Sequence, residues 1–357
     1  MAGSRKSWSD MESAWKSDDN GSLDMVIEAS GRISFCPRGD GNWRKGAKMK
    51  DWYQMNNKSM RQEENEKREF LRQGWTTDRL NLGMRLHDTP PMGLEERLCY
   101  IKNQGFSCAH VALSKVLGEN ESADMALTPG YGNVLRRMFS AQGIELAVLG
   151  CYLNLANPDR QQLAAIQKRY MAHIRLAAIA GCGVVGTETG APNTEYRFVP
   201  ECHTEEAFRS FLYGLKPVVR YAEQMGVIIG IEPVATHIVH TPKLARRMLD
   251  EIASPNLQII FDPVNLLYIE NYEKRDEILG EATELLAEEI AVVHIKDFRI
   301  EKGKFINTAA GTGMMDYAPI LKFLKEKKPW IACTLEDTTP ENAMEAAGYI
   351  HKIYEEA

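Results

Sequence analysis

The chain has 357 residues, of which 44% are apolar and 26% are charged, and its formal net charge at neutral pH is -6. This length and apolar fraction suffice for a large buried core, since roughly 250 residues make a complete eight-stranded barrel. The mildly acidic balance excludes a broad phosphate-neutralising surface and therefore disfavours nucleic acid as a partner.

Residues 1–78 differ in composition from the rest of the chain. They are rich in Ser, Gly, Asn, Lys and Asp, show no sustained helical or strand period, and hold every tryptophan except Trp330. A mostly polar segment with isolated aromatic residues does not easily build its own core. We expect a disordered extension, an arm that docks on a partner, or a stretch upstream of a later start at Met55 or Met60. Within it, only residues 64–73 have the pattern of a helix.

From Leu80 onward, strand-like and helix-like segments alternate. The predicted strands are residues 80–88, 106–114, 144–154, 183–188, 227–233, 257–263, 290–297 and 330–337. Amphipathic stretches lie between them, and two of these end at Gly181 and Gly226, as helices commonly do. Strand–helix units joined by short connections predict an α/β fold, a parallel (β/α)8 TIM barrel over residues 79–357, preceded by the polar extension.

Residues 181–186, GCGVVG, match the G-x-G-x-x-G pattern of dinucleotide-binding sites. A dinucleotide site needs a strand, then the glycines, then the start of a helix, whereas these glycines follow a helix and run into a strand. We interpret them as a helix end that leads into the fourth strand. An open doubly wound sheet, the competing architecture, would need fewer strands and a phosphate-binding first turn.

Four successive strands end in an acidic or imidazole side chain: Glu232, Asp262, His294 and Glu336. Buried parallel strands carry such side chains to the C-terminal face of a barrel, where the chemistry of this fold is located. A single charged residue at a strand end is commonly a cap or a surface ion pair. The repetition in four successive units instead indicates one site, and three carboxylates with one imidazole suit Mn²⁺, Mg²⁺, Co²⁺ or Zn²⁺.

The motifs IEPV, FDPVN, HIKD and LED at these strand ends, with the loop AAGTGMMDY at 309–317, resemble the sugar phosphate isomerase/epimerase family of xylose-isomerase-like TIM barrels. The resemblance covers residues 80–357 and is specific for the superfamily rather than for a substrate. It implies that Glu232, Asp262, His294 and Glu336 hold a divalent metal, with Mn²⁺ as the first expectation. It also implies that Glu232 and Glu336 act as acid and base.

Physical chemistry supports such a mechanism. Removal of a proton beside a carbonyl produces an enediolate, whose negative charge a divalent metal stabilises by several kcal/mol. Two carboxylates on opposite faces of that planar intermediate allow one to abstract the proton and the other to return it. Inversion at carbon, or transfer between neighbouring carbons, follows from this geometry.

The chain also departs from the ketose 3-epimerase pattern. Asn265 stands where those enzymes have a substrate-contacting histidine, and an amide can hydrogen-bond a hydroxyl but carries no proton at neutral pH. His237 and His240 follow Glu232, where the pattern supplies neither. Arg299 is close in spacing to an arginine of that pattern and equally compatible with a surface position.

Further polar residues are predicted at the same rim. We expect His87, Glu188, His237, Asn265 and Lys296 to bind substrate. Lys296 would attract an anionic group or the enediolate, unless it forms an ordinary ion pair with Asp297. Several more side chains face this rim without an assigned role: Arg85, Asp88, His110, Tyr152 and Asn154.

A lone histidine inside a strand, such as His110, is more often structural than a ligand. The glycine-rich loop 309–317 either binds a phosphate through backbone N–H groups or forms a mobile loop over the mouth of the barrel.

Three functions remain open at this stage. The first is a metal-dependent isomerase or epimerase acting on a sugar, a sugar phosphate or a keto-polyol, with a small-molecule carbohydrate as its ligand. The second is a metal-dependent lyase that cleaves a 3-keto C-glycoside with a companion subunit, with His87, His237 or His240 as the extra acid or base. The third is a non-catalytic sugar-binding barrel. A DNA-repair nuclease is disfavoured because Asn265 stands where a further metal histidine would be needed and the chain is acidic.

The remaining expectations concern the cellular setting. The seven cysteines are scattered without CxxC pairs, which is typical of a reducing compartment. No apolar stretch approaches a membrane span, and the first residues lack the apolar segment of a signal peptide. We therefore expect a cytoplasmic protein without a membrane partner, and the sequence leaves open whether it forms a homo-oligomer.

Overall fold

The computed structural model describes residues 24–27, 33–36, 79–117 and 123–357. The chain divides into two units, residues 1–75 and 76–357. In the first unit, β1 (Asp24–Ile27) pairs antiparallel with β2 (Ile33–Cys36). The sequence predicted no strand here, because runs of four residues are too short to establish a period of two. The predicted helix at 64–73 lies outside the described residues.

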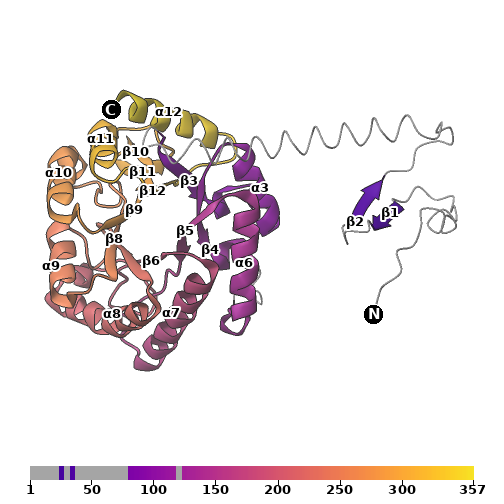
Figure 1. The fold of residues 1–357 in the computed structure, drawn as a ribbon. Helices are drawn as coiled ribbons and strands as arrows, with labels where there is room; N and C mark the ends of the chain where they lie inside the picture. Colours follow the sequence, from indigo (N-terminus) through magenta and orange to yellow (C-terminus); the bar gives the residue numbers. More distant parts are fainter. Residues whose placement is uncertain (1–23, 28–32, 37–78, 118–122) are drawn as a thin grey trace, which may run out of the picture. The chain divides into compact units, whose positions relative to one another are not determined.

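The second unit is a closed barrel of eight parallel strands (Figure 1), which confirms the predicted TIM-barrel fold. Neighbours along the chain are neighbours in the barrel, and the last strand closes the ring by pairing with both the first and the seventh. The strands are β3 (Asn81–Arg85), β4 (Cys108–Ala112), β5 (Glu145–Gly150), β6 (Val184–Glu188), β7 (Ile228–Glu232), β8 (Leu257–Phe261), β9 (Ile290–Ile295) and β12 (Ala332–Leu335).

Helices alternate with the strands and surround the barrel (Figure 1). They are α3 (Leu94–Asn103), α4 (Leu113–Val116), α6 (Pro129–Gln142), α7 (Arg160–Ala180), α8 (Glu205–Met225), α9 (Pro242–Ile252), α10 (Arg275–Leu286), α11 (Ala318–Lys327) and α12 (Ala343–Glu356). Short 3-10 turns are η2 (Leu86–Asp88), η3 (Asp124–Ala126), η4 (Pro200–His203) and η5 (Tyr272–Lys274). Within the described ranges, none of the helices combines the length and the apolar character that a membrane span requires.

Local sequence signals explain where the longest helices begin and end. The Asp159 and Thr204 side chains accept hydrogen bonds from the first turns of α7 and α8. Gly181 and Gly226 end these helices in the left-handed conformation, with φ of 82° and 65°. The interpretation of GCGVVG as a helix end that leads into a strand is therefore confirmed.

Several predicted strands are too long. The first ends at Arg85, and His87 and Asp88 lie in the turn η2 instead. The seventh ends at Ile295, and Asp297 begins a hairpin of β10 (Asp297–Glu301) and β11 (Lys304–Thr308) that was not predicted.

The missed hairpin had a sequence signal. Lys302 and Gly303, the two turn residues, both have positive φ, and an Xaa-Gly pair between alternating residues favours such a turn.

The barrel interior has an apolar layer and a polar layer, because alternate residues of each strand point inward. The apolar layer is a separate buried cluster of small side chains: Cys108, Ala147, Val148, Val184, Ile260, Val292 and Ala332. On β9 and beyond β12, the residues two and four positions further along, His294 and Glu336, belong to the polar layer. The barrel is thus filled at one end, and its polar side chains gather at the C-terminal end.

Candidate metal centre

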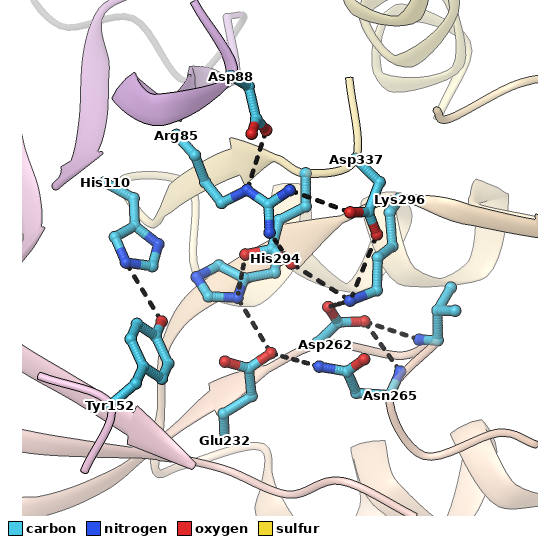
Figure 2. Close-up of polar contacts among 12 residues, drawn as sticks. Arg85, Asp88, His110, Tyr152, Glu232, Asp262, Asn265, His294, Lys296 and Asp337 are labelled. Carbon is cyan, nitrogen blue, oxygen red and sulfur yellow. Dashed lines mark hydrogen bonds and ion pairs between the residues drawn. The ribbon is translucent and has the colours of Figure 1, made fainter. Parts of the chain in front are cut away.

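Four side chains from adjacent strands converge in the polar layer, and three of them are labelled in Figure 2: Glu232, Asp262 and His294. Glu232 ends β7, Asp262 follows β8, His294 lies near the end of β9, and Glu336 follows β12. Each offers one ligand atom, and these four atoms all lie within 4.8 Å of one another. All four residues are buried, with 4% exposure or less. We call this set the quartet.

Hydrogen bonds orient the acids of the quartet. One oxygen of Asp262, Oδ1, accepts the backbone N–H groups of Val264 and Asn265 at 2.9 and 3.0 Å, which turns Oδ2 toward the centre. The Asn265 side chain donates from Nδ2 to Oε1 of Glu232 at 2.6 Å. His294 Nδ1 lies 3.3 Å from the same oxygen and 3.1 Å from Glu336 Oε1. The imidazole therefore faces two carboxylates with one nitrogen.

Lys296 lies inside the quartet rather than beside it. Its ammonium Nζ is 2.7 Å from Asp262 Oδ2, in an ion pair, and 3.2 Å from Glu336 Oε2. The side chain is 4% exposed. The alternative that Lys296 pairs with Asp297 is wrong, because the carboxylate of Asp297 is engaged elsewhere.

A second cation, Arg85 at the end of β3, holds the outer side of Glu336. Its guanidinium lies 3.3 Å from Glu336 Oε2, 3.0 Å from Asp337 and 2.9 Å from Asp88 (Figure 2). Arg85 and Asp88 were expected at the rim without a role. Their contacts now assign one: Arg85 fixes the position of Glu336 and is itself fixed by two further carboxylates.

These charges shift the pKa values of the quartet. Burial acts to lower the pKa of His294, but Glu336 and Glu232 outweigh it and raise that pKa to about 9. Burial acts to raise the pKa of Glu336, but His294, Lys296 and Arg85 hold it well below its ordinary value. Burial raises the pKa of Asp262 to about 6 against the opposing charge of Lys296.

The residues present fit a divalent cation. With the imidazole neutral, as a metal ligand requires, three carboxylates face the ammonium of Lys296 and, on the outer side, the guanidinium of Arg85, which also serves two other carboxylates. Negative charge therefore remains in excess, in a region from which water is largely excluded. Like charges buried this close together need a compensating cation. Oxygen and imidazole ligands are those that Mn²⁺, Mg²⁺, Co²⁺ and Zn²⁺ accept. The imidazole already presents Nδ1 to the carboxylates, which is the orientation a ligand needs.

On the other side of His294 lies a group of uncharged rings: His87, His110 and Tyr152. The His110 ring stacks on His294 with centroids 5.2 Å apart, and its Nε2 lies 3.2 Å from the Tyr152 hydroxyl. A β-carbon at Gly150 would come within 2.8 Å of that Nε2, so only glycine leaves room for this pair. His87 meets His110 edge-on at 6.4 Å.

Burial keeps this group neutral. It lowers the pKa of His110 well below its ordinary value and that of His87 to about 3, and it raises the pKa of Tyr152. His110, His294 and Glu336 also offer ligand atoms within 4.8 Å of one another. Sequence reasoning treated His110 as structural; the alternation of inward side chains along β4 was the signal that it reaches the site.

Glu188 and His237 form a third group beside the quartet. Glu188 ends β6 opposite Glu232 in the ladder, accepts a hydrogen bond from the Tyr196 hydroxyl at 3.1 Å, and lies 3.6 Å from His237 Nδ1. Burial raises the pKa of Glu188 and lowers that of His237 to about 4. His240 is not part of this group, because its ring stacks on His203 at 3.7 Å.

Two other expectations are corrected. Asp297 accepts the backbone N–H groups of the glycine-rich loop, at Gly311, Gly313 and Met315. These groups were the expected phosphate donors, and an internal carboxylate already uses them, so they form no phosphate site. The same bonds pin the loop, which argues against a mobile cover. Arg299 lies on β10, half-exposed, and pairs with Glu301, so it takes the surface position.

Comparisons with known proteins agree with the barrel fold. The sequence matches the xylose isomerase-like TIM barrel family over residues 105–353. No curated protein sequence matches the chain.

Among solved structures, the chain is similar to the apo form of 3-keto-D-glucoside 4-epimerase from E. coli, with 15% identity and a TM-score of 0.61 over 77% of this chain and 100% of that one. A D-tagatose 3-epimerase-like protein has 18% identity and a TM-score of 0.61, over 77% of this chain and 97% of that one. The IOLI protein with a bound zinc atom has 19% identity and a TM-score of 0.58, over 78% of this chain and 99% of that one.

Proposed function

The chain belongs to the xylose isomerase-like TIM barrel family, and from this premise we propose that it is a divalent-metal-dependent isomerase or epimerase acting on a sugar. One observation carries the proposal: Glu232, Asp262, His294 and Glu336 present four ligand atoms within 4.8 Å of one another at the C-terminal end of the barrel. Mn²⁺ is the first candidate for the metal. The sugar epimerases among the similar structures support the substrate class.

In this proposal Glu232 and Glu336 transfer the proton. They come from β7 and β12, which are separated in the barrel by β8 and β9, so a substrate lying between them would meet a carboxylate on each side. A bound divalent ion would stabilise the negative charge that develops on the substrate during proton removal.

Each glutamate is already held in place by its neighbours. Asn265 orients Glu232, while Arg85 and Lys296 orient Glu336 and keep it ionised. One of the two enters the step as a carboxylate and abstracts the proton beside the carbonyl, while the other enters as a carboxylic acid and returns its own proton to the intermediate; proton exchange with solvent then resets the pair.

The residues predicted to bind substrate divide into two groups. His87 and the pair Glu188–His237 line opposite flanks of the quartet and are proposed to hydrogen-bond sugar hydroxyl groups. Lys296 and Asn265 contact the quartet itself, so we propose that they position its carboxylates and meet substrate oxygens only next to Asp262 and Glu232. The N–H groups of Gly311, Gly313 and Met315 in the glycine-rich loop are already bonded to Asp297, which favours an unphosphorylated sugar.

The test is a screen of the full-length protein with Mn²⁺ against ketoses, ketose phosphates and 3-keto glycosides in deuterated water, read by NMR. Deuterium incorporation beside a carbonyl, absent in Asp262→Ala, supports the proposal. Release of an aglycone would favour the lyase with a companion subunit. Tight metal and sugar binding without exchange for any substrate would contradict the proposal and favour a non-catalytic sugar-binding barrel.

A further inference from the structure

A cavity of about 730 Å³ lies beside the quartet at the C-terminal rim. It is enclosed by the loops that follow β6, β7 and β8 and by the hairpin β10–β11. Clefts of about 300–1,000 Å³ are typical of sites for drug-sized ligands, which are larger than a single sugar ring. The reacting part of a sugar would be held at the quartet, whose residues do not line this cavity, so the cavity offers room for a further part of the ligand.

One residue connects the cavity wall with the quartet. Asn265 lines it and also donates its side-chain hydrogen bond to Glu232. The backbone of Asn265 is fixed as well, since its carbonyl accepts the N–H of Ala235 at 2.6 Å. Asn265 thus marks the border that a group attached to a sugar at the quartet would cross to reach the cavity.

The cavity wall presents several apolar side chains. Phe198 and Ile269 are exposed to 52% and 37%, although most large apolar side chains of the barrel unit are buried. Leu267 and Phe305 complete this surface, and the Phe305 ring stacks on buried Phe298 with centroids 4.5 Å apart. Exposed apolar side chains gathered in a concave surface mark a binding site rather than random exposure.

The charged groups of the cavity do not suit an anionic ligand. Lys304 and Glu270 both line it, one of each sign, so they create no single-sign field. A phosphate or carboxylate ligand would need a convergent group of cations or free N–H donors. The lining therefore favours an uncharged, largely apolar group.

We propose that this cavity is a subsite for an apolar, ring-sized substituent of the sugar, so that the substrate is a glycoside with an aromatic or alicyclic aglycone rather than a free monosaccharide. The inference rests on the proposed function, because it takes the quartet as the place where the sugar is held.

The test measures binding of matched glycoside pairs to the full-length protein loaded with Mn²⁺, by calorimetric titration. Phenyl and methyl 3-keto β-glycosides derived from glucose, galactose and xylose form the pairs, because the proposed reaction needs a carbonyl on the sugar. The expected result is a preference of at least about tenfold for the phenyl member of each pair that binds, the lower range for an added group in a hydrophobic pocket.

Two variants locate that preference. Ile269→Asp places a charge in the cavity wall and should abolish the phenyl preference while the methyl glycoside binds as before. Val134→Asp is the matched control, because Val134 is equally exposed, at 38%, but lies on α6 away from the cavity. It should keep the preference. Both variants are exposed-site changes, and their thermal melting checks that they fold.

The outcomes separate this inference from the proposed function. Equal affinities within every pair, no binding in any pair, or an unchanged preference in Ile269→Asp would overturn the subsite, whatever the metal titration shows. A phenyl preference that depends on Ile269 in a protein that binds no Mn²⁺ would keep the subsite and reject the metal-dependent function.

Discussion

Two sectors of the same barrel rim shift the pKa values of their buried histidines in opposite directions. His294, in the sector formed by β7, β8, β9 and β12, has its pKa raised to about 9. His110, on β4, has its pKa lowered well below the ordinary value. Their rings stack 5.2 Å apart, and both are buried. Burial disfavours the charged imidazole in both places, so the difference comes from Glu232 and Glu336, which lie against His294 Nδ1.

The comparison separates a charged sector from a neutral one. The charged sector can hold a cation because its excess of carboxylates is only partly offset by Lys296 and Arg85. The neutral sector, with His87, His110 and Tyr152, can offer hydrogen bonds and a ring surface, and the carboxylate beside it, Asp88, is already paired with Arg85. If this division is correct, changes in the two sectors should have different consequences.

The largest effect is expected for metal binding. Asp262→Ala or His294→Ala should remove most of the Mn²⁺ bound by the purified protein, because each deletes a ligand of the quartet. His110→Ala, the matched change in the neutral sector, should keep one Mn²⁺ per chain. Metal analysis of the folded variants is the measurement. Full Mn²⁺ occupancy in Asp262→Ala, or loss of Mn²⁺ in His110→Ala, would contradict the division into a charged and a neutral sector.

A second expectation concerns proton transfer. Glu232→Gln and Glu336→Gln each keep an oxygen ligand but remove the base, so turnover should fall by at least about 100-fold while metal occupancy falls less. Solvent exchange and metal content are measured on the same samples. Near-normal exchange in either metal-loaded variant would clear that glutamate of the role and direct attention to His87 or His237.

Lys296 tests the charge balance within the charged sector. Its ammonium occupies the position between Asp262 and Glu336, so Lys296→Met should tighten Mn²⁺ binding by about tenfold or more, since a nearby unit charge is worth several kcal/mol. The metal-free variant should melt at a lower temperature, because two buried carboxylates lose their partner. Lys304→Met, at the cavity edge, is the control. Weaker Mn²⁺ binding in Lys296→Met would show that the ammonium supports the site instead.

In the metal-free protein, the histidines of the two sectors should change the folding stability with pH in opposite directions. The folded-state pKa of His294 is raised, so its stabilising contribution is complete below about pH 6.5 and is lost as the pH rises through about 9. The pKa of His87 is lowered to about 3, so its contribution is present above about pH 6.5 and is lost as the pH falls toward 3.

Melting temperatures between pH 4 and 9.5 check this expectation. The difference between the unsubstituted protein and His294→Gln should shrink toward alkaline pH, and the difference from His87→Gln should shrink toward acid pH. Parallel curves for both variants would mean that neither histidine is shifted by its sector.

The smallest effect on the rim is expected from the N-terminal segment. Deletion of residues 1–75 should leave a barrel that unfolds cooperatively, because all eight strands and their helices lie beyond this point. Calorimetric melting and Mn²⁺ titration of the truncated protein are the measurements. Loss of cooperative unfolding would show that the tryptophan-bearing segment belongs to the core of the barrel unit.

The sequence alone determined the barrel and the four residues of the quartet. Strand–helix alternation is a local pattern, and a carboxylate or imidazole at the end of a buried strand points to the C-terminal face whatever the neighbours are. Helix ends were equally local, as at Gly181 and Gly226. The hairpin β10–β11 was missed even though its turn signal, Lys302–Gly303, is also local.

Only the tertiary structure decided which side chains share the site and in what charge state. His110 and His294 are 184 positions apart in the chain, and no local pattern indicates that their rings stack. The sequence predicts that Lys296 faces substrate, with an ion pair to the adjacent Asp297 as the alternative. Consecutive side chains of an extended segment point to opposite sides, and Lys296 lies in the extended connection between β9 and β10. Lys296 therefore turns into the barrel toward Asp262 while Asp297 turns to the loop. Contacts between side chains of different strands set the protonation states of the site, and these contacts exist only in the closed barrel.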